Sequence, residues 1–145
     1  DISGTTGKTK RLESLKLELK NKDYTGGICY NAHVQTIGWQ ADPNKSATWK
    51  KDGEFCGTTG NAKRLEAIQI ELYGEMAEHY DIYYRVHSQT YGWMKWAKNG
   101  EMAGTTGQHK RIEGIQVVLV KKGEQAHSYN YKGAVTNTTK TFLSK

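Results

Sequence analysis

Apolar and polar residues alternate along three segments of the chain. Residues 65–72 read LEAIQIEL, in which the apolar fourth, sixth and eighth positions are separated by glutamine and glutamate. Residues 12–19 and 112–119 repeat the pattern as LESLKLEL and IEGIQVVL. A period of two is typical of a β-strand, and the β-branched residues favour the same structure. The leucine and isoleucine spacing would also suit a helix, but the flanking glycines favour a strand.

The tetrapeptide Gly-Thr-Thr-Gly occurs three times, at residues 4–7, 57–60 and 104–107. Each copy is followed, after two residues, by Lys-Arg and one of the alternating segments. Two longer blocks precede the second and third copies: ICYNAHVQTIGW ends at Trp39, and IYYRVHSQTYGW ends at Trp93. Repetition over this length indicates one structural unit that is built several times.

The C-terminal segment completes a third unit when it is aligned at the same offset from its own Gly-Thr-Thr-Gly copy. Tyr131 then corresponds to Tyr84, and Leu143 corresponds to Trp96. On this alignment the chain begins two or three positions after the point at which it ends. The missing piece corresponds to the Asn-Gly pair 99–100, which is typical of a tight hairpin turn. Three units that close into a ring explain this better than an open stack, which needs end caps.

Four strands in each of three units of about 48 residues give twelve strands. This all-β pattern predicts a β-trefoil, a barrel capped by three hairpins that leaves few open edges, with adjacent N- and C-termini. We expect one domain, 1–145, whose units are residues 24–73, residues 78–120, and a third split between 125–145 and 1–22.

Positions that stay apolar in every unit are the candidate core, because packing tolerates no loss in any copy. They are Ile28, Ile82 and Tyr129; Tyr30, Tyr84 and Tyr131; Trp49, Trp96 and Leu143; Phe55, Met102 and Ile2; and Leu65, Ile112 and Leu12. A seven-residue insertion between Trp39 and Trp49 contains the only proline, Pro43, and is expected to be a surface loop.

A second set of positions is present in two units and lost from the third. These candidate ligand-binding residues are His33, Gln35, Gly38, Trp39, His87, Gln89, Gly92 and Trp93, in whose places the third unit has Ala134, Thr136, Thr139 and Lys140. Because a buried unpaired ammonium group is costly, lysine in place of tryptophan argues that the indoles are exposed. A flat aromatic face beside neutral donors and acceptors suits a sugar. The alternative is that the third copy has degenerated and that these residues pack locally.

Alternation also predicts neighbours within each unit. On a strand, His33 and Gln35 would point to the same face. Arg64 and Glu66 would share a face as well, and they could pair or brace the Gly-Thr-Thr-Gly turn, like their counterparts in the other two units. Because this pair persists where the His-Gln-Trp set is lost, we expect it to have a structural role rather than to contact a ligand.

Composition and charge narrow the class of protein. The net charge of +6 favours an anionic partner, although the basic residues are scattered. No paired acids, nucleophile–base pair or metal-ligand cluster emerges, so we expect a binding module with no catalytic residues, cofactor or metal. Cys29 and Cys56 are expected to be free thiols rather than a disulfide. The chain begins at Asp1 without a signal-like or membrane-length apolar stretch, so it is interpreted as part of a longer protein.

The blocks Y-x-x-H-V-Q-x-x-G-W, N/D-G-E-x-x-G-T-T-G and K-R-L-E-A-I-Q-I resemble the ChW repeat, the clostridial hydrophobic repeat with a characteristic tryptophan. The resemblance covers nearly the whole chain and is weakest in the tail. It implies a secreted module that anchors a protein to the Gram-positive cell wall, as the targeting part of a phage endolysin or an autolysin. The family's His, Gln and Gly-Trp positions fall on His33, Gln35 and 38–39, and on the same positions of the second unit.

The expected partner is therefore a bacterial wall polymer, either peptidoglycan or a wall glycopolymer, bound by a monomeric domain that contacts neither nucleic acid nor membrane. A host-glycan lectin or adhesin shares the same site chemistry and is the alternative. A nucleic-acid-binding domain is the weaker alternative, and it predicts an affinity that falls steeply with salt.

Overall fold

The computed structural model describes residues 2–4, 12–58, 63–123 and 142–144, and it confirms that the protein is all-β. Its strands are β1 Ile2–Gly4, β2 Ser14–Leu15, β3 Gly27–Val34, β4 Gly38–Trp39, β5 Lys50–Lys51, β6 Cys56–Gly57, β7 Leu65–Tyr73, β8 Tyr80–Ser88, β9 Gly92–Trp93, β10 Ala97–Lys98, β11 Ala103–Thr106, β12 Ile112–Lys121 and β13 Phe142–Ser144. The helices are η1 Ser46–Thr48 and α1 Glu75–His79. Within these residues, no helix has the length and hydropathy needed to span a membrane.

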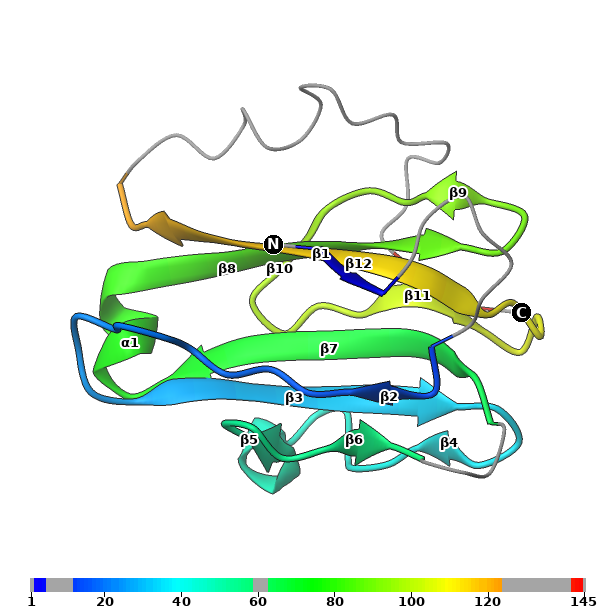
Figure 1. Cartoon of the computed structure of the whole chain (residues 1–145), viewed down its shortest axis with the longest axis horizontal. Coiled ribbons are helices and arrows are strands. Elements are labelled where there is room, and N and C mark those ends of the chain that lie inside the picture. The colour runs from blue at the N-terminus through cyan, green and yellow to red at the C-terminus, as the bar shows by residue number, and fades with distance from the viewer. Residues whose placement is uncertain (1, 5–11, 59–62, 124–141, 145) are drawn as a thin grey trace.

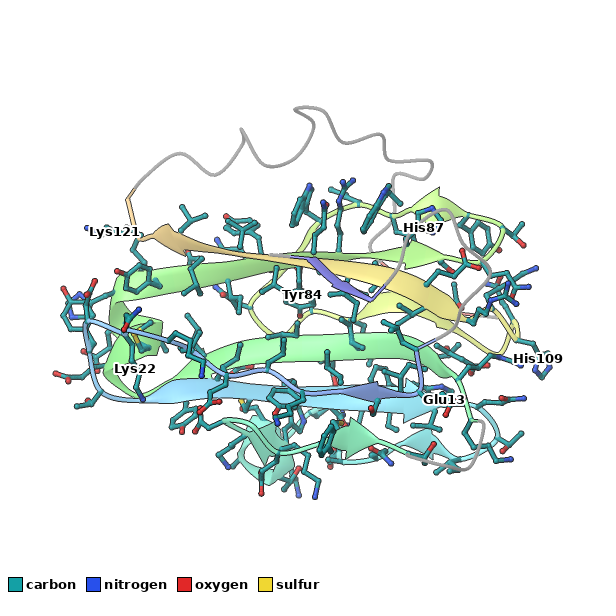
Figure 2. All side chains as sticks on the ribbon, viewed as in Figure 1. Glu13, Lys22, Tyr84, His87, His109 and Lys121 are labelled. Carbon is teal, nitrogen blue, oxygen red and sulfur yellow. The ribbon has the colours of Figure 1, made fainter. Side chains whose placement is uncertain are left out.

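The described strands form three sheets (Figure 1). The first has the order β1-β12-β8-β10, with β9 also paired to β8. The second has the order β13-β11-β7-β3-β4, with β5 paired to β3, and the third consists of β2 and β6. In Figure 1 the long strands β8 and β12 lie above the long strands β7 and β3. Figure 2 places the buried side chain of Tyr84 between these two layers, where the hydrophobic core lies.

Two long antiparallel strand pairs repeat the same register. In the β3–β7 pair Tyr30 lies opposite Ile70, and in the β8–β12 pair its counterpart Tyr84 lies opposite Val117. Both tyrosines are fully buried, and each donates its hydroxyl to the carbonyl of the residue that follows a tight turn. A buried phenol needs such a partner, so the repeated sequence places the same hydrogen bond in both units.

The predicted tight turns at residues 52–53 and 99–100 are confirmed. Their φ values are 40° and 88° in the first turn and 41° and 85° in the second. Two successive positive φ angles are typical of the turn that Asp-Gly and Asn-Gly favour between antiparallel strands. The Oδ1 atoms at positions 52 and 99 also accept the backbone N–H groups of Ile28 and Ile82, at 3.0 and 2.8 Å.

Each Gly-Thr-Thr-Gly copy begins by pairing with the alternating strand of a different unit. The three pairings have the same register: Gly57 opposite Ser14, Gly104 opposite Ala67, and Gly4 opposite Gly114. A Cβ atom on Gly57 or Gly104 would lie 2.5 Å from a backbone carbonyl oxygen of the partner strand. Glycine is therefore required at both positions, because only a residue without a side chain permits this approach.

The β-trefoil prediction is confirmed only as far as the all-β class. The described strands form three sheets and no closed barrel, and neither the trefoil topology nor the number of repeats is confirmed. Strand β13 also departs from the repeat alignment, because it pairs in parallel with the edge of β11, whereas its counterpart β10 pairs antiparallel with β8. Residues 124–141, with Asp1 and Lys145, lie outside the described residues, so most of the third unit and the expected meeting of the termini stay predictions.

The predicted core is confirmed for most positions of the first two units. The buried members are Ile28, Tyr30, Trp49, Leu65, Ile82, Tyr84, Trp96 and Ile112. The prediction is wrong for Phe55, which is 57% exposed because it follows the tight turn and packs at the surface, with the Lys16 ammonium 5.1 Å from its ring. Met102 and Leu12 are half-buried. The predicted core side chains of Ile2, Tyr129, Tyr131 and Leu143 lie outside the described part.

The insertion around Pro43 forms a loop, residues 40–48, most of whose residues are at least partly exposed, as predicted. Its backbone also satisfies buried polar side chains. Gln69 Nε2 donates to the Pro43 carbonyl at 3.1 Å, and Asn31 Nδ2 donates to a loop carbonyl at 2.9 Å. The indole Nε1 of Trp49 donates to another loop carbonyl at 2.8 Å. The loop is therefore a cover for the first unit.

Both cysteines are free, as predicted, and both are buried. Cys29 does not face solvent, because every residue of β3 from Gly27 to Ala32 is buried. Burial raises the pKa of Cys29 and of Cys56 to about 11. The neutral thiol is therefore the form that the folded chain keeps at physiological pH.

Candidate functional site

The candidate residues of each unit lie on a short hairpin at the end of a long strand. His33 on β3 lies opposite Trp39 on β4, and His87 on β8 lies opposite Trp93 on β9. The imidazole and indole rings meet edge to face, with centroids 5.4 Å apart at 82° in the first hairpin and 5.2 Å apart at 85° in the second. Both indoles are half-buried, not exposed as the sequence predicted, because this contact packs each ring against its neighbour.

A β-bulge brings a carboxylate to the first histidine. Leu65 and Ala67 lie opposite the consecutive residues Val34 and His33, which leaves Glu66 as the extra residue of β7. Such a bulge re-aims a side chain, and Glu66 Oε1 lies 3.3 Å from the histidine Nδ1. Because Glu66 is only 4% exposed, its negative charge depends on nearby partners.

The second unit repeats this arrangement. Glu113 occupies the bulge of β12, and its Oε1 lies 3.3 Å from Nδ1 of His87. Each carboxylate also accepts a hydrogen bond from the arginine two residues earlier: Arg64 Nε lies 3.2 Å from Glu66 Oε2, and Arg111 Nε lies 3.1 Å from Glu113 Oε2. The predicted Arg–Glu pair is thus confirmed in both units. The guanidinium balances the charge of the buried carboxylate.

The two glutamines attach each hairpin to the neighbouring strand. The N–H of Gln35 donates to the Arg64 carbonyl at 2.9 Å, and Gln35 Oε1 accepts the Arg64 N–H at 3.3 Å. Gln89 and Arg111 form the same two bonds at the same distances. The expectation that His33 and Gln35 share a strand face does not hold, because β3 ends at residue 34 and Gln35 lies in the turn. Both glutamine oxygens therefore serve the fold.

A threonine in each turn adopts a left-handed conformation, with φ of 64° at Thr36 and 77° at Thr90. Positive φ is unusual for a β-branched residue. Lys63 Nζ and Lys110 Nζ each donate to the hydroxyl of this threonine at 3.0 Å. We call the residues that hold each hairpin a clamp: the first clamp is His33, Gln35, Thr36, Lys63, Arg64 and Glu66, and the second clamp is His87, Gln89, Thr90, Lys110, Arg111 and Glu113.

The environments of the two indoles differ. The guanidinium of Arg85 lies 4.2 Å from the ring centroid of Trp93 and 5.0 Å from that of Trp96. Arg85 is 2% exposed, burial lowers its pKa to about 10, and its Nε donates to Gln116 Oε1 at 2.6 Å. The corresponding residue of the first unit is Asn31, which is bonded to the insertion loop. A cation therefore covers one face of Trp93, which leaves that face unavailable for stacking on a ligand.

The first clamp borders an open depression of about 340 Å³. Its lining residues are His33, Thr36, Ile37, Gly38, Glu66, Gly107 and His109. Of the predicted residues, His33 and Gly38 take part in this lining, whereas Gln35 and Trp39 do not. Ile37 is 55% exposed and gives the depression an apolar wall. The first hairpin thus combines acceptors, donors and an apolar surface in one open site.

The sequence did not predict the part of this depression that comes from another unit. Gly107 and His109 follow β11, whose pairing with β7 brings them beside Glu66. No spacing along the chain indicates this proximity, because it arises from sheet pairing. Thr36 and Glu66 carried a usable signal, since each recurs in the second unit beside the same His and Gln.

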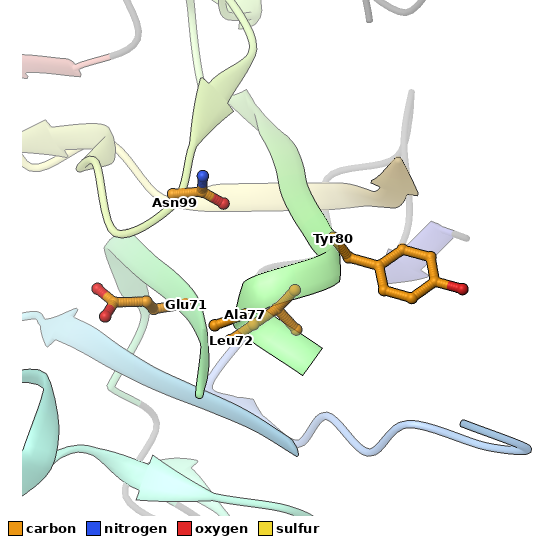
Figure 3. Close-up of a pocket in the computed structure, with 5 residues that line it drawn as sticks. All are labelled: Glu71, Leu72, Ala77, Tyr80 and Asn99. Carbon is orange, nitrogen blue, oxygen red and sulfur yellow. The ribbon is translucent and has the colours of Figure 1, made fainter. Parts of the chain in front are cut away.

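A second depression, of about 230 Å³, lies between β7, α1 and the turn at residues 99–100 (Figure 3). Its lining residues are Glu71, Leu72, Ala77, Tyr80 and Asn99. None of the candidate residues common to the two units is part of this lining. In the described part of the chain, no group of three or more His, Cys, Asp or Glu side chains is placed to hold a metal ion. The candidate site is therefore the depression at the first clamp.

The family model described as Clostridial hydrophobic W matches residues 33–74 and 87–121. Each matched segment begins at the histidine of a clamp, and the two segments together cover just over half of the chain. No curated protein and no solved structure matches the chain. ChW repeats are binding-type domains associated with cell-surface and wall-binding modules. The chain therefore belongs to the ChW, or Clostridial hydrophobic W, family.

Proposed function

We propose that the chain is a non-catalytic domain that binds a cell-wall polymer of Gram-positive bacteria and so attaches a longer secreted protein to the envelope. The observation that carries this proposal is the construction of one clamp twice, with the same bonds at nearly the same distances. Two weak sites on one body give avidity toward a ligand that itself repeats. A wall polymer is such a ligand.

The chemistry of the depression supports a carbohydrate ligand. His33 offers its imidazole, and the Thr36 hydroxyl, which already donates to the Gln35 carbonyl at 2.6 Å, offers an acceptor. The exposed Ile37 offers an apolar surface to the C–H face of a sugar ring. Arg64 balances the charge of Glu66, so this part of the site favours hydroxyl groups over ions.

Two finer points belong to the same proposal. We propose that the protein attached to this domain is a peptidoglycan hydrolase, such as an endolysin, which the domain directs to the wall. The resemblance of the repeated blocks to ChW repeats supports this proposal. We also propose that the complete chain is a β-trefoil. The shared register of the three glycine pairings supports a threefold arrangement of the units.

The proposal is tested by sedimenting the whole chain with purified Gram-positive walls, then with walls stripped of teichoic acid and finally of peptide. We expect retention on intact walls, lost at the step that removes the bound polymer and changed by no more than about twofold between low and high salt. A chain that stays in solution with every preparation contradicts the proposal. Retention that falls tenfold or more with salt, together with binding to DNA, would instead support a nucleic-acid-binding domain.

A further inference from the structure

We infer that the imidazole of His109, which comes from a different unit, completes the first binding site, and that this site takes a neutral, hydroxyl-bearing ring such as a sugar residue of the wall polymer. The inference rests on the proposed function. His109 makes the two sites unequal.

The sheet pairing explains how a second unit reaches the first clamp. Gly104 lies opposite Ala67, next to the bulge at Glu66. The chain that leaves β11 therefore passes the mouth of the depression, where Gly107 and His109 become part of its lining. Figure 2 shows His109 at the same end of the molecule as His87, away from the end that carries Lys22 and Lys121.

The loop that carries His109 is fixed by the second hairpin. The hydroxyl of Tyr91 donates to Oε1 of Gln108, the residue directly before His109. His109 itself has a φ of 58°, in the left-handed region, which histidine enters more readily than most residues. Tyr91 is thus a positioning residue for a site on the other hairpin. This contact links the loop that carries the exposed His109 to the second hairpin before any ligand arrives.

The lining favours a neutral ring over a phosphate or an ammonium group. A phosphate would face the carboxylate of Glu66, and an ammonium group would compete with Arg64 for that carboxylate. Lys63 donates to Thr36 but is not itself among the lining residues. Two imidazoles, one hydroxyl and two glycine backbones remain as donors and acceptors, beside the apolar side chain of Ile37. This combination matches a polyhydroxyl ring with one apolar face.

The second site lacks this imidazole. His109 corresponds to Ala62 in one of the other Gly-Thr-Thr-Gly blocks and to Thr9 in the remaining one. Histidine at this position therefore exists once among three copies. The first site consequently has an imidazole that no other copy of the motif can supply.

The test is an NMR titration of the ¹⁵N-labelled chain with a muramidase digest of purified Gram-positive walls. The amides of Ile37 and His87 report on the first and second hairpins separately. We expect the wild type to respond at both. His109→Ala and His109→Thr introduce the residues of the other two copies. Each should raise the ligand concentration at the titration midpoint of the Ile37 amide at least about fivefold, the equivalent of one hydrogen bond. The midpoint at His87 should change by less than about twofold.

Tyr91→Phe should raise the midpoint at Ile37 in the same direction, although Tyr91 lies on the other hairpin. His79→Ala is the matched control, because His79 lies on α1 at the opposite end of the molecule and should leave both midpoints unchanged (Figure 1). A glycerol phosphate oligomer, used as the anionic probe, should not shift Ile37.

Several results would overturn the inference. One is an unchanged titration midpoint at Ile37 in both His109 variants, with a dispersed amide spectrum that shows they are folded. Another is an equal rise of the midpoint at Ile37 and at His87. The third is a shift of the Ile37 amide on addition of glycerol phosphate. If the wild type does not respond to the digest but is retained on whole walls, the inference fails and the proposed function stands. If the wild type neither responds nor is retained, the proposed function fails with it.

Discussion

Glu66 Oε1 lies 3.3 Å from His33 Nδ1, and the same atoms of the second unit are again 3.3 Å apart. The contact exists because a one-residue bulge turns the buried carboxylate toward the hairpin. With Nδ1 facing the carboxylate, Nε2 is the imidazole nitrogen left for a ligand. A repeated structural contact therefore orients the imidazole in both clamps.

Replacing the bulge carboxylate should lower stability. Glu66→Gln leaves the Arg64 guanidinium without its charged partner, and we expect a loss of roughly 1–3 kcal/mol in the free energy of unfolding. Urea denaturation should show a lower midpoint with an unchanged slope. Glu78→Gln, on the exposed face of α1, is the matched control and should stay within about 0.5 kcal/mol of wild type. Equal effects of the two substitutions would contradict the role of the bulge.

Two glycines with positive φ should respond differently to alanine. At Gly38, with φ of 94°, an added Cβ meets nothing within 4 Å, so only the backbone conformation opposes it and the cost should be about 1–2 kcal/mol. At Gly104, with φ of 116°, the Cβ would also lie 2.5 Å from the Glu66 carbonyl oxygen. Overpacking should add about 1–3 kcal/mol there. Urea midpoints of Gly38→Ala and Gly104→Ala measure the difference, and a larger loss at Gly38 would be inconsistent with this register.

The indoles of Trp39 and Trp93 should contribute to both binding and stability. Each ring packs edge to face against a clamp histidine, so the double substitution to alanine should release both imidazoles and abolish retention on walls. Because both rings are half-buried, it should also cost roughly 1–3 kcal/mol. Thermal melting and wall sedimentation of the same sample measure the two effects. Trp39→Phe combined with Trp93→Phe should recover most of the stability. Full stability of the alanine variant would show that the edge-to-face contacts carry no energy.

The two buried thiols should make stability depend on pH in the alkaline range. Burial raises the pKa of Cys29 and Cys56 to about 11, whereas the pKa of a thiol in the unfolded chain is about 8.5. For an acid whose pKa is raised by folding, the stabilising contribution is complete below about pH 8.5 and declines as the pH rises toward 11. The free energy of unfolding should therefore fall over this range, and less steeply in a Cys29→Ala, Cys56→Ala variant. Equal slopes would contradict the burial of the thiols, as would rapid reaction of the native chain with a thiol reagent at pH 8.

Local features of the fold were predictable from the sequence. Two of the three alternating segments are the long strands β7 and β12, because period-two patterning needs only neighbouring residues. Residues 12–19 form only the two-residue strand β2, so the prediction of a full strand is wrong there. The turns at 52–53 and 99–100 follow from their Asp-Gly and Asn-Gly pairs. Phe55 was misplaced because an apolar residue in every copy does not fix its burial once a turn carries it to the surface. Packing depends on the neighbours that surround a position in space.

The candidate site was predictable only in part. His33 and Gly38 were identified because they recur with the tryptophan motif, and both line the depression. The bulge that directs Glu66 toward His33 was not predictable from alternation, since a bulge is an exception to it. The approach of His109 depends on the pairing of β11 with β7, which no local pattern specifies.

Wall retention of the histidine variants tests the central claim most directly. The whole chain is sedimented with purified Gram-positive walls as wild type, His33→Ala, His87→Ala, the double variant and the His79→Ala control. A second double variant has glutamine in place of both histidines. It keeps a polar side chain at each position and is the control for misfolding of the alanine double variant. We predict weaker retention for each single variant, none for either double variant, and wild-type retention for His79→Ala. Wild-type retention of a folded double variant would contradict the account.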